Sequence, residues 1–458
     1  MEAGCILLTS TSTDSENSRA AVKVDQMLHS QVGGSTRQKP LPSPAIPRTN
    51  TGRDRKDERL SIAGSIASSS ASGAPESSTE LPYPPCVMRY GRRYLSDPSL
   101  PYPFPCDVSE LLRQNLWTTF LVEVFGAPFC SPWLDNGSPQ KVLEVACGTG
   151  YWSSICHDHL VNLGYPKVSF TGLDVAPLAT DLHEQGLQWT FVQHDLRRAP
   201  LPFENDVFDL VFAKDLSFVA PAAAFQNSLM DEYLRILKPG GTLEIWDSDH
   251  ALRTLLPHPP MSPAITRKDQ QRAKQLATYP ILPSTPGTPP QNSYLRDYNS
   301  WIKKALDRRN LLSMPCTAIG PIMVQEADAL ANQGNRRFAI LLSEVRWERE
   351  GIGGGQVSEE GPSGRKRSIS RLMSSAKGKS AETEPRLLTP DQWALRRTAL
   401  MIFVQMIESL EPLLKEASDK NQDEWGRWWA GMMESLLEKK GTSNGECMEV
   451  GAWWGQKT

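Results

Sequence analysis

Three acidic residues in the middle of the chain have the types and positions that suit a nucleoside ligand. Asp174 follows the apolar segment VSFTGL, Asp195 follows WTFVQH, and Glu144 lies within KVLEV. A carboxylate at the end of a strand can accept two hydrogen bonds from ribose hydroxyl groups, and another can accept from the amino group of adenine. Glu144 suits a positively charged amino acid group. The three carboxylates therefore predict a neutral or cationic nucleoside.

A glycine-containing turn after the first apolar segment narrows the choice of ligand. In KVLEVACGTGYWS, an apolar strand runs into Gly148 and Gly150 and then into residues with helical spacing. A dinucleotide fold would carry a third glycine where Ser153 stands, and a phosphate-binding loop would carry Gly-Lys-Ser or Gly-Lys-Thr. The turn has neither pattern. The remaining interpretation is a nucleoside without phosphates, and S-adenosylmethionine has that character.

Alternating strands and helices are expected to hold these residues together. The pattern of apolar residues predicts strands at 141–146, 168–174, 189–193, 207–213 and 242–247, and helices near 150–162, 177–185 and 226–237. A further helix is expected ahead of the first strand, at 108–125. Because each strand is followed by a helical pattern, the connections should be right-handed crossovers. The sequence thus predicts a doubly wound α/β fold with a mainly parallel sheet.

Four segments resemble the successive motifs of class I S-adenosylmethionine-dependent methyltransferases, in the order of that family. They are VLEVACGTGYWS, FTGLDVAP, QHDLRRAPLPFENDVFDLVFAKD and YLRILKPGGTLEIWD, and the resemblance covers roughly residues 140 to 248. It implies a Rossmann-like methyltransferase fold with seven strands, of which the last is antiparallel. Residues 338–347 and 447–456 would supply the final two strands.

The resemblance also implies roles for individual residues, with S-adenosyl-L-methionine as the cofactor. Contacts to the methionine part are expected from Glu144, Ala146, Gly148 and Gly150, a contact to the ribose from Asp174, and contacts to the adenine from Asp195 and Leu196. Lys214 and Asp215 follow the fourth strand. They could line the methyl-transfer site, with Asp215 accepting a substrate proton, or serve an ordinary turn or N-cap. His250, after the fifth strand, is a further candidate for the pocket.

The chain divides into six regions by composition and pattern. We expect a disordered tail at 1–82, a lead-in arm and helix at 83–139, the cofactor-binding core at 140–249, an insert that forms a substrate or lid region with a late strand at 250–349, a low-complexity basic insert at 350–387, and C-terminal helices with the last strand at 388–458. Nine prolines between Pro257 and Pro290 argue against helix and central strand there. Ser368 and Ser370 in the basic insert are candidate phosphorylation sites.

Composition bears on the function classes and partners. The formal charge of -3 and the pI near 6.2 give no electrostatic case for nucleic acid. No apolar run reaches a membrane span and the start has no basic signal region, so we expect a cytoplasmic or nuclear protein without a membrane partner. Eight cysteines without a C-x-x-C pair predict reduced, mostly buried thiols and no metal site.

A second resemblance concerns the lead-in arm. GRRYLSDPSLPYPFPCDVSELLRQ is similar to the lead-in of fungal methyltransferases that include the velvet-complex regulators, which commonly carry a G-R-R-Y element. Two hypotheses follow. The chain is an active methyltransferase that acts by in-line displacement on a small-molecule or protein acceptor, or it is a catalytically weak regulatory protein of the same fold that acts through protein partners.

Overall fold

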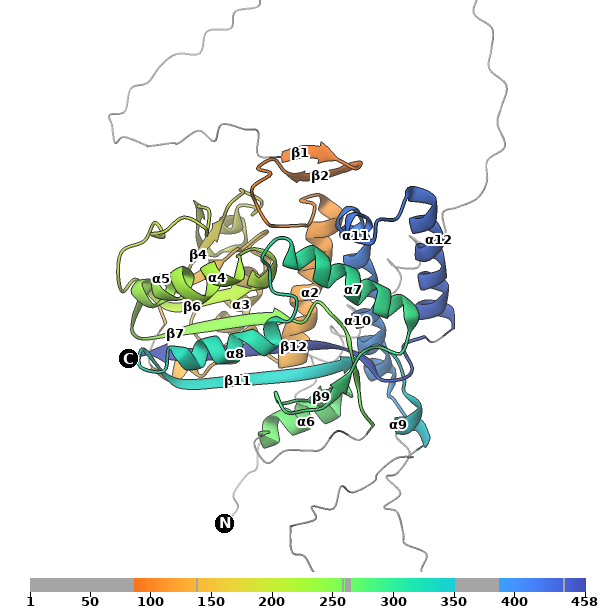
Figure 1. The fold of residues 1–458 in the computed structure, drawn as a ribbon. Helices are drawn as coiled ribbons and strands as arrows, with labels where there is room; N and C mark the ends of the chain where they lie inside the picture. The colour runs from red at the N-terminus through yellow and green to blue at the C-terminus, as the bar shows by residue number, and fades with distance from the viewer. Residues whose placement is uncertain (1–85, 137–138, 258, 260–264, 351–386, 440) are drawn as a thin grey trace, which may run out of the picture. The chain divides into compact units, whose positions relative to one another are not determined.

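The computed structural model describes residues 86–136, 139–257, 259, 265–350, 387–439 and 441–458. The expected disordered tail at 1–82 lies outside the described residues, as does most of the basic insert, including Ser368 and Ser370. All described residues belong to one compact unit, drawn in Figure 1.

Five parallel strands form the centre of the sheet, in the order β5-β4-β3-β6-β7. They are β3 (Lys141–Val145), β4 (Ser169–Asp174), β5 (Gln188–Gln193), β6 (Phe208–Lys214) and β7 (Leu237–Ser248). The chain returns for β12 (Glu446–Lys457), which lies antiparallel between β7 and β11 (Leu330–Leu341). The predicted mainly parallel sheet with an antiparallel last strand is confirmed. Among the described residues, the expected seven strands become ten, because the sheet also includes the short strands β8 (Arg253–Leu255), β9 (Tyr279–Pro280) and β10 (Gly287–Thr288).

Helices cover both faces of this sheet, which makes the fold doubly wound. Val142 of β3 points into an apolar cluster with α2 (Val108–Phe125), α3 (Tyr151–Asn162), α7 (Ser293–Asp307) and α10 (Pro390–Ser409). Its neighbour Leu143 points into a separate cluster with α5 (Met230–Ile236) and α8 (Pro315–Gln325). Successive residues of a strand face opposite sides. The apolar run of β3 is therefore buried from both sides.

Local sequence signals fix the ends of the helices that support the site. Helix α2 begins after Asp107, whose side chain accepts the Glu110 N–H, and ends at Gly126 in the left-handed conformation. Helix α10 begins with the predicted capping box of Thr389 and Gln392. After α10 come α11 (Glu411–Ser418), α12 (Gln422–Met433) and a π-helical turn at Glu434–Glu438.

Three predicted elements differ from the structure. Residues 177–185 contain only a 3₁₀ turn (Leu182–Gln185), because Asp181 caps it and Gly186 ends it after one turn. The proline-rich stretch contains α6 (Arg267–Leu276), a proline-free segment that begins after the N-cap Thr266. The strand expected at 338–347 is shifted toward the N-terminus: β11 runs from Leu330 to Leu341, where β12 supplies its partners, and Arg346–Glu350 form the short helix α9.

Short elements complete the unit. They are the hairpin β1 (Cys86–Arg89) and β2 (Arg92–Leu95), the edge strands β8 (Arg253–Leu255), β9 (Tyr279–Pro280) and β10 (Gly287–Thr288), the helices α4 (Ala222–Ala224) and α9 (Arg346–Glu350), the 3₁₀ turns at Trp133–Asn136 and Leu216–Phe218, and a π-helical turn at Phe225–Leu229. Among the described helices, none combines the length and the apolar character that a membrane span requires.

Candidate active site

A cavity lies at the carboxyl ends of the parallel strands. Its floor is formed by the residues that follow or end five strands: Ala146 and Gly148, Asp174 and Val175, His194 to Leu196, Lys214 and Asp215, and Ser248 and Asp249. Its other walls come from residues 95 to 117 and from Ile402, Phe403 and Met406 of α10. Ligands of open α/β sheets bind at this edge, where the strands diverge. Of the predicted cofactor residues, Glu144 and Gly150 are not on this lining.

The turn after β3 places Gly148 on the cavity lining and Gly150 against the apolar core. Both glycines have positive φ angles, 53° and 71°, a conformation that glycine adopts without strain. A Cβ added to Gly150 would lie 2.9 Å from Leu182 Cδ1 and 3.1 Å from the ring of Trp189. A Cβ on Gly148 would meet its nearest atom, Gln114 Oε1, at 3.7 Å. Gly150 is therefore needed for packing, and Gly148 leaves room for a ligand.

Asp174 links this turn to the end of β4. Its Oδ2 accepts the Gly148 N–H at 2.8 Å, and its Oδ1 accepts the Ala176 N–H at 3.3 Å. Burial raises the pKa of the carboxyl, while these backbone bonds act against the rise. Each carboxylate oxygen has two acceptor positions, so one on each oxygen remains for a ligand in the cavity.

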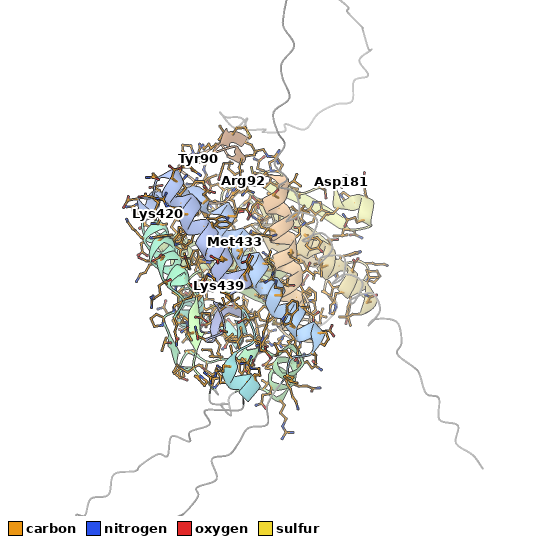
Figure 2. All side chains as sticks on the ribbon, turned by 90° about the vertical axis from the view of Figure 1, so that its right-hand side faces the viewer. Tyr90, Arg92, Asp181, Lys420, Met433 and Lys439 are labelled. Carbon is orange, nitrogen blue, oxygen red and sulfur yellow. The ribbon has the colours of Figure 1, made fainter. Side chains whose placement is uncertain are left out.

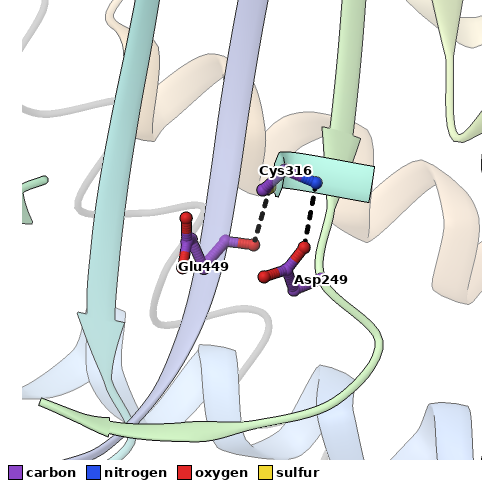
Figure 3. A group of neighbouring side chains, drawn as sticks. All are labelled: Asp249, Cys316 and Glu449. Carbon is purple, nitrogen blue, oxygen red and sulfur yellow. Dashed lines mark hydrogen bonds between the residues drawn. The ribbon is translucent and has the colours of Figure 1, made fainter. Parts of the chain in front are cut away.

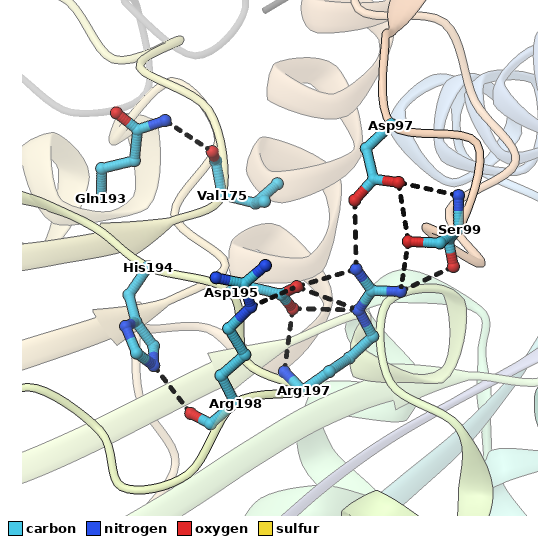
Figure 4. A network of polar contacts seen from close by, with 8 residues as sticks. All are labelled: Asp97, Ser99, Val175, Gln193, His194, Asp195, Arg197 and Arg198. Atoms are coloured by element: carbon cyan, nitrogen blue, oxygen red, sulfur yellow. Dashed lines mark hydrogen bonds and ion pairs between the residues drawn. The ribbon is translucent and has the colours of Figure 1, made fainter. Parts of the chain in front are cut away.

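Asp195 lies on the cavity lining, but both its oxygens are bonded to Arg197. The guanidinium donates to them over 2.7 to 3.1 Å. The same side chain donates to Ser99 O at 2.6 Å and to Asp97 Oδ2 at 3.3 Å, as Figure 4 shows. Burial acts to raise the pKa of Asp195, but the bonds from Arg197 outweigh it and the pKa is lowered. Arg197 thus fastens residues 87–105, which we term the cover segment, to the floor of the cavity. Leu196, the next residue along the chain from Asp195, is buried at the cavity.

Glu144 is held inside the fold by a residue of α3. It is buried within β3, and its Oε2 accepts from Ser153 N at 3.2 Å and Ser153 Oγ at 2.6 Å. Burial raises its pKa to about 7. The side chain therefore ties β3 to the first turn of α3, because its position within the strand directs it into the apolar layer between sheet and helix. Glu144 is absent from the cavity lining, and its expected contact to the methionine part stays a prediction.

Lys214 and Asp215 form a pair on the cavity floor. Lys214 Nζ lies 2.5 Å from Asp215 Oδ2, and the indole N–H of Trp117 donates to Asp215 Oδ1 at 3.2 Å. Asp215 has a φ of 55° and precedes a 3₁₀ turn, yet its side chain makes no capping hydrogen bond. Asp215 thus occupies the N-cap position of this turn through its backbone alone, and both of its carboxylate oxygens are oriented by residues of the cavity lining.

His250 does not reach the cavity lining. Its ring stacks on Phe218 with the ring centres 3.6 Å apart, and its Nε2 lies 2.8 Å from Ser217 Oγ. Burial lowers its pKa to about 3, so the imidazole is neutral. Phe218 stands between His250 and the cavity.

Several lining residues gave no signal in the sequence motifs. Tyr102 and Phe104 of the cover segment and Arg113, Gln114 and Trp117 of α2 form one wall. Gln114 donates to Tyr102 Oη at 2.7 Å, and Arg113 pairs with the buried Glu110 at 2.5 Å. The closely spaced aromatic residues of the PYPFP segment were the one feature of the sequence that could have indicated this wall. None of the described residues from 250 to 335 lines the cavity. The cover segment and α10 supply walls of the cavity, and the expected lid role of the 250–349 region stays a prediction.

Asp249 of the floor, Cys316 and Glu449 approach one another (Figure 3), with possible metal-binding atoms within 4.8 Å of one another. Cys316 N donates to Asp249 Oδ1 at 2.9 Å. The Glu449 carboxylate, however, is paired with two guanidinium groups, those of Arg253 and Arg337. Two cations beside the carboxylate oppose a metal ion at this position. The group is a charge-balanced packing cluster, in which Asp249 Oδ2 has no hydrogen-bond partner.

Residues 142–241 match the family model described as a methyltransferase domain. This segment is a methyltransferase domain. The methyltransferase domain includes β3 to the start of β7 and provides most of the cavity floor. Its strands lie in the order β5-β4-β3-β6-β7, with the antiparallel β12 next to β7.

Similar proteins match parts of the chain. The chain is 33% identical over 78 residues to the malonyl-[acyl-carrier protein] O-methyltransferase of Anoxybacillus flavithermus, over 16% of this chain and 27% of that protein. It thus spans about a quarter of that relative's length. A phosphoethanolamine N-methyltransferase 2 of Haemonchus contortus, bound to phosphomonomethylethanolamine and S-adenosylhomocysteine, is 13% identical, with a TM-score of 0.31 over 77% of this chain and 61% of that one. The PH0226 protein of Pyrococcus horikoshii is 24% identical, with a TM-score of 0.23 over 28% and 54%.

Proposed function

We propose that the chain transfers a methyl group from S-adenosylmethionine to an acceptor held in the cavity. The observation that carries the proposal is the arrangement of Asp174 and Gly148. A carboxylate with one free acceptor position on each oxygen lies beside a turn in which the glycine leaves space. These residues fit the ribose and the methionine part of that cofactor, which supplies an activated methyl group on a positively charged sulfur.

Other lining residues fit the rest of the cofactor. Ala146 and Gly148 would contact the methionine part, and Leu196 the adenine ring. Asp195 is proposed to act through Arg197, because the guanidinium holds the cover segment over this end of the cavity. Gly150 supports the same turn through its packing.

The acceptor is proposed to bind between the aromatic wall and the floor beyond Lys214 and Asp215. Trp117, Phe218 and Phe403 enclose this part, and apolar walls exclude water from the reacting groups. Asp249 also lines the cavity and is 3% exposed; its Oδ1 accepts the Cys316 N–H, and its Oδ2 lies 3.8 Å from the guanidinium of Arg253. Burial raises the pKa of Asp249 to about 6. The lining encloses this part of the cavity with side chains from the cover segment, α2 and α10, so we propose a small-molecule acceptor.

The alternative, a regulatory protein that works through partners, rests on the G-R-R-Y element. Both arginines of this element make contacts within the chain. Arg92, labelled in Figure 2, donates to both oxygens of Asp107 at 2.7 and 2.8 Å and to Ser409 Oγ of α10. Arg93 donates to Cys106 O at 2.8 Å. These contacts support a structural role of the element in the wall of the cavity, so the enzyme is the function that we favour.

The test combines binding with turnover. Calorimetric titration of the full chain with S-adenosylmethionine and S-adenosylhomocysteine should give one site per chain. Release of S-adenosylhomocysteine should then be screened against fractions of small metabolites and of peptides, with the metabolite fractions active. Absence of binding would refute the cofactor assignment, and turnover with peptides alone would refute the small-molecule acceptor.

Asp249→Asn refines the acceptor assignment, because asparagine keeps the oxygen that accepts the Cys316 N–H. This variant should bind the cofactor product as the unchanged protein does and lose at least about tenfold in turnover, a typical size for one well-placed polar group. The exposed Asp158 on α3 offers the matched control, Asp158→Asn. Unchanged turnover in Asp249→Asn would remove Asp249 from the acceptor site.

A further inference from the structure

Two cysteines lie in contact at the ends of the cover segment. Cys86 Sγ and Cys106 Sγ are 3.3 Å apart. Cys86 opens β1 opposite Leu95 of β2, and the Cys106 N–H donates to Arg93 O of β2 at 2.6 Å. Backbone hydrogen bonds therefore hold both residues against the same strand. No other pair of cysteines in the described part of the chain has its sulfur atoms in such contact.

The residues between these cysteines cover the cofactor end of the cavity. Leu95, Leu100, Tyr102 and Phe104 line it, and Asp97 and Ser99 are bonded to Arg197 on the floor (Figure 4). Opening of the cover segment would move these residues away from the cavity floor. The two cysteines flank the segment that would move.

We propose that Cys86 and Cys106 form a reversible disulfide that closes the cover segment into a ring and restrains its opening. The oxidant is a small disulfide such as oxidised glutathione. The partly exposed Cys86 thiolate attacks it, forms a mixed disulfide and releases one glutathione thiolate. The Cys106 thiolate then attacks the Cys86 sulfur and releases the second glutathione. Two protein thiols are oxidised, and one glutathione disulfide is reduced to two glutathione molecules.

The surroundings of the two sulfur atoms set the order of these steps. Cys86 is half-buried, whereas Cys106 is buried, with 1% of its surface exposed. Burial, together with the neighbouring Cys86 thiol and against the charge of Arg93, raises the pKa of Cys106 to about 12. Cys106 is therefore the resolving thiol. Ring closure should quicken as pH rises, because the thiolate is the attacking form.

The structural part of this proposal is tested by mass mapping of the full chain. After incubation in oxidised glutathione at pH 8, peptide mapping without reduction should find Cys86 linked to Cys106, and reduced glutathione should restore both thiols. Cys86→Ser and Cys106→Ser should each prevent the link, whereas Cys130→Ser, at a half-buried cysteine elsewhere, should not. Both thiols remaining free in oxidised glutathione would overturn the proposal. This measurement does not depend on any ligand.

The functional part rests on the proposed cofactor site. Dissociation of S-adenosylhomocysteine, followed by stopped-flow tryptophan fluorescence, should slow by on the order of tenfold in the disulfide form, since lid opening limits release in many enzymes. Reduction should reverse the effect, and Cys86→Ser should abolish it. A disulfide that leaves the dissociation rate unchanged would overturn the restraint. If S-adenosylhomocysteine does not bind at all, the proposed function fails, and limited proteolysis of residues 87–105 then serves as the readout. Equal cutting of both forms would overturn the restraint.

Discussion

Replacing Asp174 should weaken cofactor binding strongly while leaving the fold intact. The side chain accepts one backbone N–H on each oxygen, at 2.8 and 3.3 Å, and keeps one acceptor position on each for the ribose. Asp174→Ala would remove two hydrogen bonds to a charged acceptor. At about 1 to 1.5 kcal/mol net for each bond, the loss is about 2 to 3 kcal/mol, or roughly 30- to 150-fold in Kd.

Asp174→Asn provides a graded comparison. Asparagine keeps one acceptor oxygen but loses the charge, so we expect about half of that loss in binding free energy. Thermal unfolding of the unliganded alanine variant should change little. Loss of the hydrogen bond to Gly148 lowers the free energy of unfolding. Removal of a carboxylate whose charged form is disfavoured by burial offsets part of that loss.

Titration calorimetry with S-adenosylhomocysteine measures these affinities, with Asp158→Ala on the exposed side of α3 as the control. The assignment of Asp174 to the ribose would be refuted if the Kd of Asp174→Ala lay within about twofold of the Kd of the unchanged protein. That ratio corresponds to a difference of roughly 0.4 kcal/mol in binding free energy. An equal weakening by the control would show that the loss is not specific to the site.

Three further predictions follow from the same geometry. Burial raises the pKa of Glu144 from 4.5 to about 7, so the stability that this group contributes is present below pH 4.5 and is lost as pH rises toward 7. Glu144→Gln should therefore be more stable than the unchanged chain by about 1 to 3 kcal/mol at pH 8 and similar at pH 5, as measured by urea unfolding; the same difference at both pH values would contradict the pKa argument. Arg197→Ala frees the cover segment from the cavity floor, so proteolysis within residues 87–105 should quicken and cofactor affinity should fall by about tenfold; unchanged cutting would show that the segment is held by other contacts. Gly150→Ala should lower the free energy of unfolding by about 1 to 3 kcal/mol, because its Cβ would meet Leu182 at 2.9 Å, whereas Gly148→Ala should affect cofactor binding more than stability; equal effects of the two substitutions would contradict their different surroundings.

Short-range patterns were enough to predict the centre of the fold. The apolar run of β3, the glycine turn and the helical spacing of α3 are consecutive in the chain, so their geometry depends on neighbouring residues. The same holds for the capping box of α10. Most of the proposed cofactor residues follow directly from this pattern, because the carboxyl ends of parallel strands meet at one edge of the sheet.

Contacts between distant segments decided the rest. The polar start of β11 forms a strand because β12 supplies its partners over most of its length, and no local propensity indicates that pairing. Glu144 accepts from Ser153 and is absent from the cavity lining, and the oxygens of Asp195 accept from a guanidinium that also binds the cover segment. The sequence determines which residues stand at the ends of the strands. The tertiary structure alone decides which way their side chains point and what encloses them, because both depend on packing between residues far apart in the chain.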